Sequence, residues 1–435
     1  MLEKFQSILK VEELRNRIFY TLAILIVYRI GGHIPTPGID GTILTQALSN
    51  NTIFGLLDLF AGGAFAKATI FALGIMPYIS ASIMLQLLGA VVPYLQRLQR
   101  EGEEGRRKIT QYTRYLTVLI SGMQAWGTAV FLTTINLNGV SAVHMDKMSF
   151  IPLTVLTFTS GCILIMWLGE KITERGIGNG ISLIIFIGII ARFPDAVMEE
   201  TLLVWHGSRS LILEAFMIAM MVAVIAAVIL VTRAQRRVPV QYPRKVVGRR
   251  VFGGASTHLP LSVNSAGVIP IIFAQSIMFL PATVAQLFPN EDWLQNMVAN
   301  TFAPGGFWYS IVYGLIIVFF GYFYTAIVYN PMEIADNMRK NGGYIPGIRP
   351  GKNTAELIEK ILTRITLPGA LFFAAIAVLP WVLISRANVN FFFGGTGLLI
   401  VVGVALDTLQ QIESHLLMRH YEGFMKKGKI RGRSM

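Results

Sequence analysis

Two glycine-rich strings are the first candidates for chemistry, because glycine-rich turns can hold phosphate groups. Residues 351–354, Gly-Lys-Asn-Thr, resemble the end of a P-loop, but Asn353 separates the lysine from the threonine and Pro346 occupies the place of the first glycine. Residues 176–180, Gly-Ile-Gly-Asn-Gly, resemble a dinucleotide-binding turn, but they lie between two apolar runs with no preceding strand. We therefore expect no nucleotide and no other cofactor, and we interpret residues 176–180 as a tight turn.

Residue types that bind metals or form covalent intermediates are equally sparse. The six histidines are scattered along the chain, and the single cysteine, Cys162, lies inside an apolar run. The sequence contains neither a metalloprotease helix motif nor a nucleophile elbow. We expect no metal site, no disulfide and no catalytic residue, so a membrane enzyme such as a protease or a lipid flippase has little support.

The composition is that of an integral membrane protein. Of the 435 residues, 54% are hydrophobic and 14% are charged, and the mean hydropathy is +0.58, which is too apolar for a soluble chain of this length. The sequence predicts an all-α protein with ten transmembrane helices. The ten apolar runs cover about residues 18–34, 69–92, 115–135, 150–169, 181–198, 211–231, 267–287, 308–329, 367–384 and 396–412.

The basic residues predict how these spans are oriented. Positively charged segments next to spans tend to stay in the cytoplasm, so both termini and the basic loops are predicted to be cytoplasmic. Residues 1–17 also have apolar positions that suit a helix lying on the membrane surface. The segments that hold 31 of the 37 Lys and Arg residues are 1–17, 93–114, 170–180, 232–266, 330–366 and 413–435.

Ten spans divide into five and five, so the second half must enter the membrane from the opposite face. We therefore expect two inverted halves, residues 18–205 and 206–412, followed by a basic tail from 413 to 435. A faint internal match supports this prediction, because a Gly-x-x-Pro string followed by Ser-Ile-Met occurs in both 74–84 and 267–278. Chance similarity between glycine- and proline-bearing apolar helices is the alternative.

Residues 54–94 do not follow the pattern of an ordinary span. The piece from Phe54 to Ala66 is too short to cross a hydrocarbon core that needs about 20 residues, so we expect it to enter the membrane without crossing. The piece from Thr69 to Val92 is long enough, but Gly74 and Pro77 lie near its middle. We expect a kinked helix beside a water-filled pathway, because irregular backbone at membrane depth needs protein or water to satisfy it.

Arg29 lies inside the first apolar run. An arginine at the bilayer centre costs about 2.5–3.5 kcal/mol on insertion scales. We therefore expect this side chain to snorkel outward, with a functional ion pair as the alternative.

Two large basic loops are candidates for binding partners. Residues 233–258 contain seven basic residues and no acidic residue, interleaved with valines as in a hairpin that projects from the membrane. Uncompensated positive charge on such a projection suits RNA phosphates or an acidic protein surface. The alternative is that these arginines only set the topology or touch anionic lipids. In the second loop, prolines and glycines at 346–351 predict a fixed turn.

Six long motifs follow one another along the chain: GIMPYISASI (74–83), EGEEGRRKITQYTRY (101–115), MWLGEKITERGIGNGIS (166–182), STHLPLSVNSAGVIP (256–270), YNPMEIADNMRKNGGYIPGIRPGKNT (329–354) and FGGTGLLIVV (393–402). In these motifs the chain resembles the SecY family of bacterial protein-conducting channels, essentially from end to end. The resemblance implies two inverted five-helix halves that open like a clam, with a lateral gate between spans two and three and spans seven and eight. It also implies that the short re-entrant helix plugs the outer vestibule.

The resemblance implies three groups of residues inside the membrane. The plug would contain Phe54, Leu56, Leu57, Leu59, Phe60, Gly62 and Gly63. A constricting ring of aliphatic side chains would consist of Ile75, Ile79, Ile181, Ile185, Ile272 and Ile400. Polar residues on the helices of the lateral gate would be Ser80, Gln124 and Ser276.

The resemblance also implies partners. Signal sequences and unfolded preproteins would pass through the channel in the bacterial inner membrane, among membrane lipids, and the channel itself would have no catalytic activity. SecE would clamp the halves and SecG would flank them. The ribosome, through its RNA, or the SecA motor ATPase would dock on Arg244, Lys245, Arg249, Arg250, Arg349 and Lys352.

A secondary transporter of a small solute is the main alternative, because inverted repeats and broken helices are common in that class. Transporters usually place ionisable residues at mid-membrane to couple transport to a gradient. Apart from Arg29 and the near-interface Asp407, the predicted spans offer almost none. The sequence therefore favours the channel.

Overall fold

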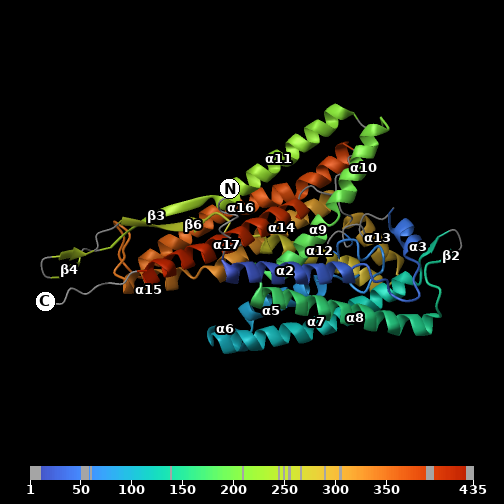
Figure 1. The fold of residues 1–435 in the computed structure, drawn as a ribbon, viewed down its shortest axis with the longest axis horizontal. Coiled ribbons are helices and arrows are strands. Elements are labelled where there is room, and N and C mark those ends of the chain that lie inside the picture. The colour runs from blue at the N-terminus through green and yellow to red at the C-terminus, as the bar shows by residue number, and fades with distance from the viewer. Residues whose placement is uncertain are drawn as a thin grey trace. The chain divides into compact units, whose positions relative to one another are not determined.

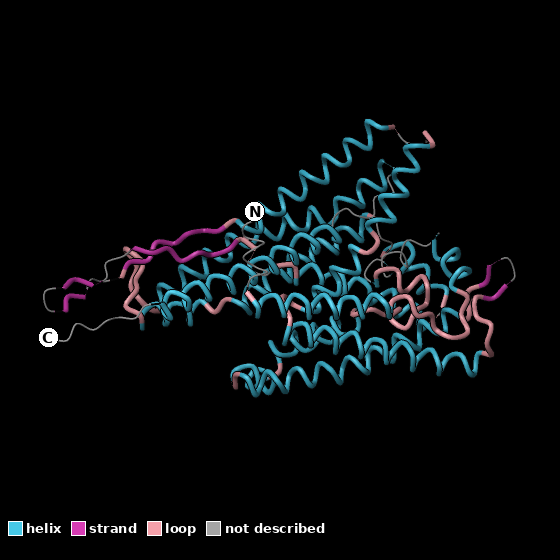
Figure 2. Tube along the Cα trace, viewed as in Figure 1, coloured by secondary structure: helices cyan, strands magenta, loops and turns pink. Residues whose placement is uncertain are grey.

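The computed structural model divides the chain into two compact units. The first contains Met1–Val197, Leu280–Ala299 and Val404–Met435, and the second contains Met198–Phe279 and Asn300–Gly403. Figures 1 and 2 show that helices dominate both. The structure describes residues 11–49, 58, 61–137, 140–207, 210–242, 245–247, 250–252, 256–264, 267–288, 291–302, 306–387 and 396–427.

The first unit is built mainly from long helices that pack in sequence order. Helix α7 packs against both α5 and α8, and α8 also packs against α2 and α9; α7 and α8 run side by side in Figure 1. The elements that lie in it or begin in it are α2 (Glu12–Gly31), α3 (Gly41–Ser49), α5 (Met76–Val91), α6 (Pro93–Arg100), α7 (Glu103–Leu132), β1 (Asn136–Leu137), β2 (Val140–Ser141), α8 (Lys147–Arg175), α9 (Gly180–Ile190), α10 (Phe193–Trp205) and α13 (Asp292–Thr301).

The second unit combines spans with a small β-structure. Helix α14 packs against α16, and α16 also packs against α15 and α11. Two helices run on from this unit into the first, namely α12 and α17. Its elements are α11 (Leu211–Arg233), β3 (Gln235–Gln241), β4 (Lys245–Val247), β5 (Arg250–Phe252), β6 (Ser256–Ser262), α12 (Ile269–Leu287), α14 (Phe307–Val328), α15 (Pro331–Lys340), α16 (Lys352–Ala387) and α17 (Thr396–Lys427).

The strands confirm the predicted hairpin in the first basic loop. Strand β3 pairs antiparallel with β6, from Gln235 opposite Ser262 to Gln241 opposite Ser256, and β4 pairs with β5 in the same way. Because side chains alternate between the faces of a strand, Val238 and Val240 both point to one side and are buried. The apolar core that they join also contains Leu261, Met338, Ile345, Ile358 and Leu362.

Each of the ten predicted apolar runs overlaps a helix, namely α2, α5, α7, α8, α9, α11, α12, α14, α16 and α17. Within the described part of the chain, seven helices are long and apolar enough to cross a membrane, or eight if the bent pair α5–α6 is one span. The predicted class of a multi-span helical membrane protein is therefore confirmed. The exact number of ten stays a prediction, because α2 and α12 do not meet this criterion.

The prediction of a kinked helix from Thr69 is wrong. Thr69 forms an isolated bridge with Pro35, residues 70–75 form turns, and α5 begins only at Met76. Gly74 adopts a positive φ of 57°, a left-handed conformation that interrupts a right-handed helix. Pro77 lies in the first turn of α5, where its missing N–H costs no hydrogen bond. Gly74 and Pro77 thus mark the start of a helix and not a bend in its middle.

The non-helical stretch before α5 satisfies its backbone on neighbouring chain. The N–H of Ile70 donates to the carbonyl of Ile34 at 3.0 Å, and the N–H of Thr36 donates to the carbonyl of Ala68 at 2.9 Å. A methyl group added to Gly161 of α8 would lie 1.9 Å from the Ile70 carbonyl oxygen. The glycine therefore allows α8 to approach this irregular backbone, which is the arrangement that non-helical chain at membrane depth requires.

Candidate functional site

A buried carboxylate organises the described part of the segment 54–66. The side chain of Asp58 is 5% exposed, and its Oδ2 lies 3.0 Å from Nη1 of Arg192, which follows α9. Its other oxygen accepts a hydrogen bond from the N–H of Ala66 at 2.8 Å, and its carbonyl accepts one from the N–H of Gly63 at 2.9 Å. One aspartate therefore closes the turn and ties it to the end of α9.

The turn itself depends on glycine. Gly62 and Gly63 both have positive φ, 65° and 87°, a region that side chains with a Cβ rarely adopt. A Cβ on Gly62 would also lie 2.9 Å from the Cα of Gly188 on α9. Gly62 thus permits both the local conformation and the close approach of the turn to α9.

Arg29 holds the same turn from another helix. Its Nη1 donates to the carbonyl of Gly62 at 2.9 Å, and the side chain is half-buried. The expectation that Arg29 snorkels outward is wrong, and its partner is a backbone carbonyl and not an acid. The physical reason is that the sharp turn leaves the Gly62 carbonyl outside any helix, so this oxygen needs a donor at that depth.

Sequence reasoning missed Asp58 and Arg192. Asp58 is the one acidic residue between Phe54 and Ala66, and Arg192 is one of the six basic residues outside the predicted cytoplasmic segments. Charges in apolar surroundings are expensive unless they are paired. These two isolated charges of opposite sign were the signal that could have revealed the contact.

Four of the six predicted ring residues lie in the first unit. Ile75 is the residue before α5 and Ile79 lies one turn into it, and both are buried. Ile181 and Ile185 lie one turn apart on α9, with Ile185 fully buried. The side chain of Asn179 fixes the start of this helix by accepting from the N–H groups of residues 181 and 182, at 3.1 and 3.3 Å.

The other two ring residues lie in the second unit. Ile272 on α12 and Ile400 on α17 are both buried. Of the predicted gate residues, Ser276 is buried and donates to the carbonyl of Ile272 at 3.0 Å, one turn earlier. Ser80 on α5 is buried and Gln124 on α7 is half-buried. A ring or a gate that joins residues of both units remains a prediction.

The plug and docking predictions fall partly outside the described residues. Gly62 and Gly63 are described, and Lys245 and Arg250 open the strands β4 and β5. Arg349 is exposed, and its carbonyl accepts from the Thr354 hydroxyl at 3.1 Å, while Lys352 begins α16 and pairs weakly with Glu356 at 3.9 Å. The predicted residues that lie outside are Phe54, Leu56, Leu57, Leu59, Phe60, Arg244 and Arg249.

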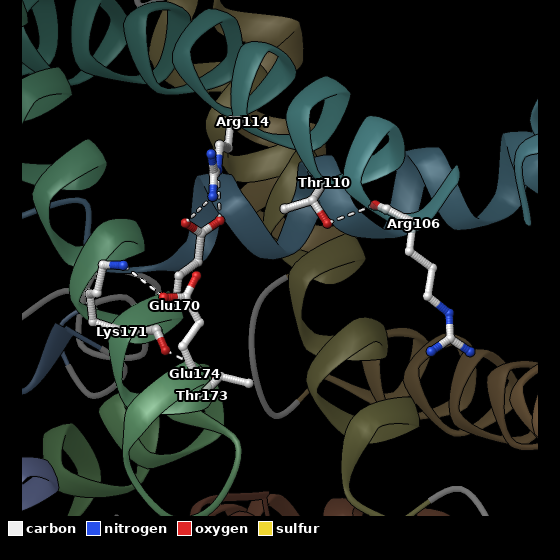
Figure 3. Close-up of polar contacts among 8 residues, drawn as sticks. Arg106, Thr110, Arg114, Glu170, Lys171, Thr173 and Glu174 are labelled. Atoms are coloured by element: carbon white, nitrogen blue, oxygen red, sulfur yellow. Dashed lines mark hydrogen bonds and ion pairs between the residues drawn. The ribbon is translucent and has the colours of Figure 1, made fainter. Parts of the chain in front are cut away.

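A charged cluster joins α7 to α8 at the end where α8 finishes (Figure 3). Arg114 donates from Nε and Nη2 to the two oxygens of Glu170, at 3.0 and 2.8 Å, a bidentate geometry that is strong for a charge pair. Lys171 bonds Glu174 at 2.7 Å one turn further on. Glu170 and Glu174 each have a basic partner, so this cluster acts as a brace that holds α7 against α8.

Within the described ranges, no group of three or more His, Cys, Asp or Glu residues is arranged to hold a metal.

Long apolar helices and an irregular turn buried between them define a multi-pass helical membrane protein. The model of the SecY family matches residues 69–409. The protein translocase subunit SecY of Thermotoga maritima is 46% identical over 440 residues, which cover 100% of both chains. That of Haemophilus influenzae is 45% identical and covers 97% of this chain and 96% of its own. The chain therefore belongs to the SecY family, as its motifs predict.

Solved structures show the same fold. One described as "The structure of a protein conducting channel" has a TM-score of 0.66 at 18% identity, covering 96% of this chain and 95% of that chain. Sec61 in a canine ribosome-channel complex from the endoplasmic reticulum has a TM-score of 0.61 at 17% identity, again covering 96% and 95%. These likenesses extend over nearly the whole chain and confirm the predicted fold class.

Proposed function

We propose that this chain is the central channel subunit of a protein translocase. It conducts unfolded preproteins across the membrane and releases hydrophobic segments sideways into the bilayer. The observation that carries the proposal is the match over the full length with chains named protein translocase subunit SecY, at 43–46% identity for relatives from several bacteria. The buried turn around Asp58 is compatible with it, because non-helical backbone at membrane depth occurs only where protein or a water-filled cavity surrounds it.

The proposed barrier to ions is the ring of six isoleucines. A protein channel must accept nearly any side chain, so charged walls would bind some substrates and conduct ions. A narrow aliphatic ring instead excludes water and yields around a passing chain without specific bonds. Ile75 and Ile79, and likewise Ile181 and Ile185, are each one helical turn apart, so each pair presents two side chains to the same direction. Ile272 and Ile400 would supply the facing wall.

The proposed resting state keeps the re-entrant segment in the outer mouth of this ring. Arg29 holds the carbonyl of Gly62, and Arg192 holds the carboxylate of Asp58. The plug would be the segment from about Phe54 to Ala66. Parting of the halves 18–205 and 206–412 along Ser80, Gln124 and Ser276 would open the side exit.

The proposed partners follow from the basic loops. Exposed Arg349 and the basic hairpin of β3 to β6 would dock a ribosome or the SecA motor. Solved relatives of this fold include Sec61 in a ribosome-channel complex and yeast Ssh1 bound to the 80S ribosome. SecE and SecG subunits would complete the assembly in the bacterial inner membrane, with both termini in the cytoplasm. The ribosome or the SecA motor would supply the energy for transport, so the chain itself needs no catalytic residue.

Reconstitution tests this function directly. Proteoliposomes that contain the chain with SecE should import a preprotein when SecA and ATP are supplied, and should import none when SecA is omitted. Saturable uptake of a small solute, coupled to an ion gradient and without preprotein import, would instead make the chain a transporter. The structure disfavours that alternative, because these charged side chains bond within the protein: Arg192 pairs with Asp58, and Arg29 donates to the carbonyl of Gly62. They are therefore not arranged around a solute cavity.

A further inference from the structure

A polar pocket of about 370 Å³ lies in the first unit, where the start of α9 meets the middle of α17. One wall of the pocket contains Asn179, in the turn before α9, and Ser182 of α9. The other contains Asp407, Thr408, Gln411 and Ser414 of α17. The amide oxygen of Gln411 accepts from the N–H of Gly178 at 2.9 Å. This bond fixes α17 against the turn and so gives the pocket a defined shape.

Two hydroxyl groups in this pocket, those of Thr408 and Ser414, can accept hydrogen bonds from a ligand. The proton of Thr408 is given to the carbonyl of Val404 at 2.7 Å, and that of Ser414 to the carbonyl of Gln411 at 2.9 Å. A hydroxyl that donates its proton to its own helix retains lone pairs for other partners. The two oxygens are therefore available to a ligand that donates hydrogen bonds.

Asp407 adds a negative charge with no compensating cation. In the described part of the chain, no hydrogen bond and no ion pair reaches its carboxylate, and none of the residues lining the pocket is basic. Asp58 is the contrast, because both of its oxygens are used within the protein. A free carboxylate beside hydroxyl acceptors is the donor-seeking arrangement that suits an ammonium or guanidinium group.

The periodicity of α17 relates this carboxylate to the proposed ring. Ile400, Val404 and Asp407 are spaced by four and three residues on one continuous helix, so they share one face. Seven residues correspond to two turns, or about 10 Å along the axis. On the proposed topology, Asp407 thus follows the ring on the cytoplasmic side and borders the same path.

We propose that this pocket binds a lysine or arginine side chain in the positively charged N-terminal region of a signal sequence, with Asp407 as the counter-charge; the inference rests on the proposed channel function. Signal sequences carry a positive segment directly before a short apolar one. Their apolar part would contact the isoleucine ring while the cation, a short distance behind, stays at Asp407. A divalent metal is a poorer occupant, because such ions usually take several carboxylates and Asp407 is the one acid among the lining residues.

Paired precursors test this site in proteoliposomes that contain the full chain with its partner subunits. The two precursors share one apolar segment and differ only in having two lysines or two glutamines in the N-terminal region. The measured quantity is the import rate of the lysine precursor divided by that of the glutamine precursor. Asp407→Asn should lower this ratio by about two- to fivefold, the factor expected for a solvent-accessible charge pair. The rate of the glutamine precursor should not change. Asp407→Glu should keep the parent ratio, and Asp407→Lys should reduce it further than the asparagine variant does.

Glu359→Gln is the matched control, because Glu359 is an exposed acid on α16; it should leave the ratio unchanged. A second measurement is independent of rates: Asp407→Cys should form a disulfide with a cysteine placed beside the lysines, and the native Cys162 does not compete because it is buried. An unchanged ratio in Asp407→Asn, an equal loss for both precursors, or import without the disulfide each overturns the site. If the parent chain imports neither precursor, the channel function itself fails, which is a distinct result.

Discussion

The guanidinium of Arg192 lies 3.0 Å from the carboxylate of Asp58, and this contact joins the end of α9 to the turn around Asp58. Arg192 is partly exposed, with 37% of its side chain accessible, while Asp58 is 5% exposed. Removing the arginine would thus leave a buried carboxylate without its counter-charge. The pair and the Arg29–Gly62 bond act on the same turn, one from the chain that follows α9 and the other from α2.

Arg192→Gln should loosen this turn. Breaking a buried pair costs about 3–5 kcal/mol when both partners are buried, and the exposure of Arg192 puts this case below that range. The resting channel should therefore leak ions more often than the parent in planar-bilayer recordings. Asp195→Asn, which changes an exposed acid in the first turn of α10, should leave the leak unchanged. A combined Asp58→Asn and Arg192→Gln variant that leaks as much as the two single changes added together would show that the contact has no role.

The two glycines of the turn should differ in their tolerance of alanine. Gly63→Ala should cost about 1 kcal/mol from the positive φ alone, because a Cβ there would have no atom within 4 Å. Gly62→Ala should cost more, since its Cβ would lie 2.9 Å from the backbone of Gly188. Thermal unfolding of the detergent-solubilised complex compares the two variants. Equal transition temperatures would mean that the turn does not rest against α9.

Arg114→Lys should weaken the brace between α7 and α8. A lysine cannot reproduce the two parallel bonds to Glu170, and we expect a loss of about 0.5–1 kcal/mol because Arg114 is partly exposed. Lys171→Gln, which breaks the more exposed pair with Glu174, should cost less. A double-mutant cycle with Glu170→Gln measures the coupling energy between Arg114 and Glu170. A coupling energy near zero would show that this pair does not hold α7 against α8.

Ile79→Asn combined with Ile400→Asn should wet the proposed ring. The double variant should raise the resting conductance and relax the need for a strongly apolar signal sequence, because the closed state loses apolar contacts. Ile30→Asn combined with Ile212→Asn is the control, since both side chains are exposed near helix ends. Single-channel recording decides the assignment: a double variant no leakier than the parent refutes it.

Arg349→Glu should abolish import driven by SecA while leaving the complex folded. The change reverses a charge on an exposed turn and removes no buried contact, because only the backbone carbonyl of Arg349 is bonded to Thr354. Lys360→Glu makes the same reversal on an exposed position of α16 and should import normally. Normal import by Arg349→Glu, or failure of that variant to assemble, contradicts a docking role.

Hydropathy and alternation predicted much of this fold, and their limits are physical. Each of the ten apolar runs overlaps a helix, because burial of apolar side chains in lipid does not depend on distant contacts. Alternating valines predicted β3 correctly for a similar local reason. The start of α5 was missed because hydropathy is continuous across Thr69–Val92, whereas the backbone conformation of Gly74 is not. The partner of Arg29 was missed because a carbonyl freed by a distant turn leaves no mark on composition.

Helix α16 links the exposed turn of Arg349 mechanically to the membrane-spanning part of the chain. It begins at Lys352, just after the exposed turn of Arg349, and continues as one helix of 36 residues to Ala387. Its first half belongs to the same apolar core as the β-hairpin, through Ile358 and Leu362. Pro368 breaks one hydrogen bond inside this helix, and its neighbour Gly369 packs so closely that a Cβ there would lie 2.9 Å from Val263. A force applied at Arg349 would therefore pass along the first half of α16 to the proline at 368, where the helix is held against the chain that follows β6.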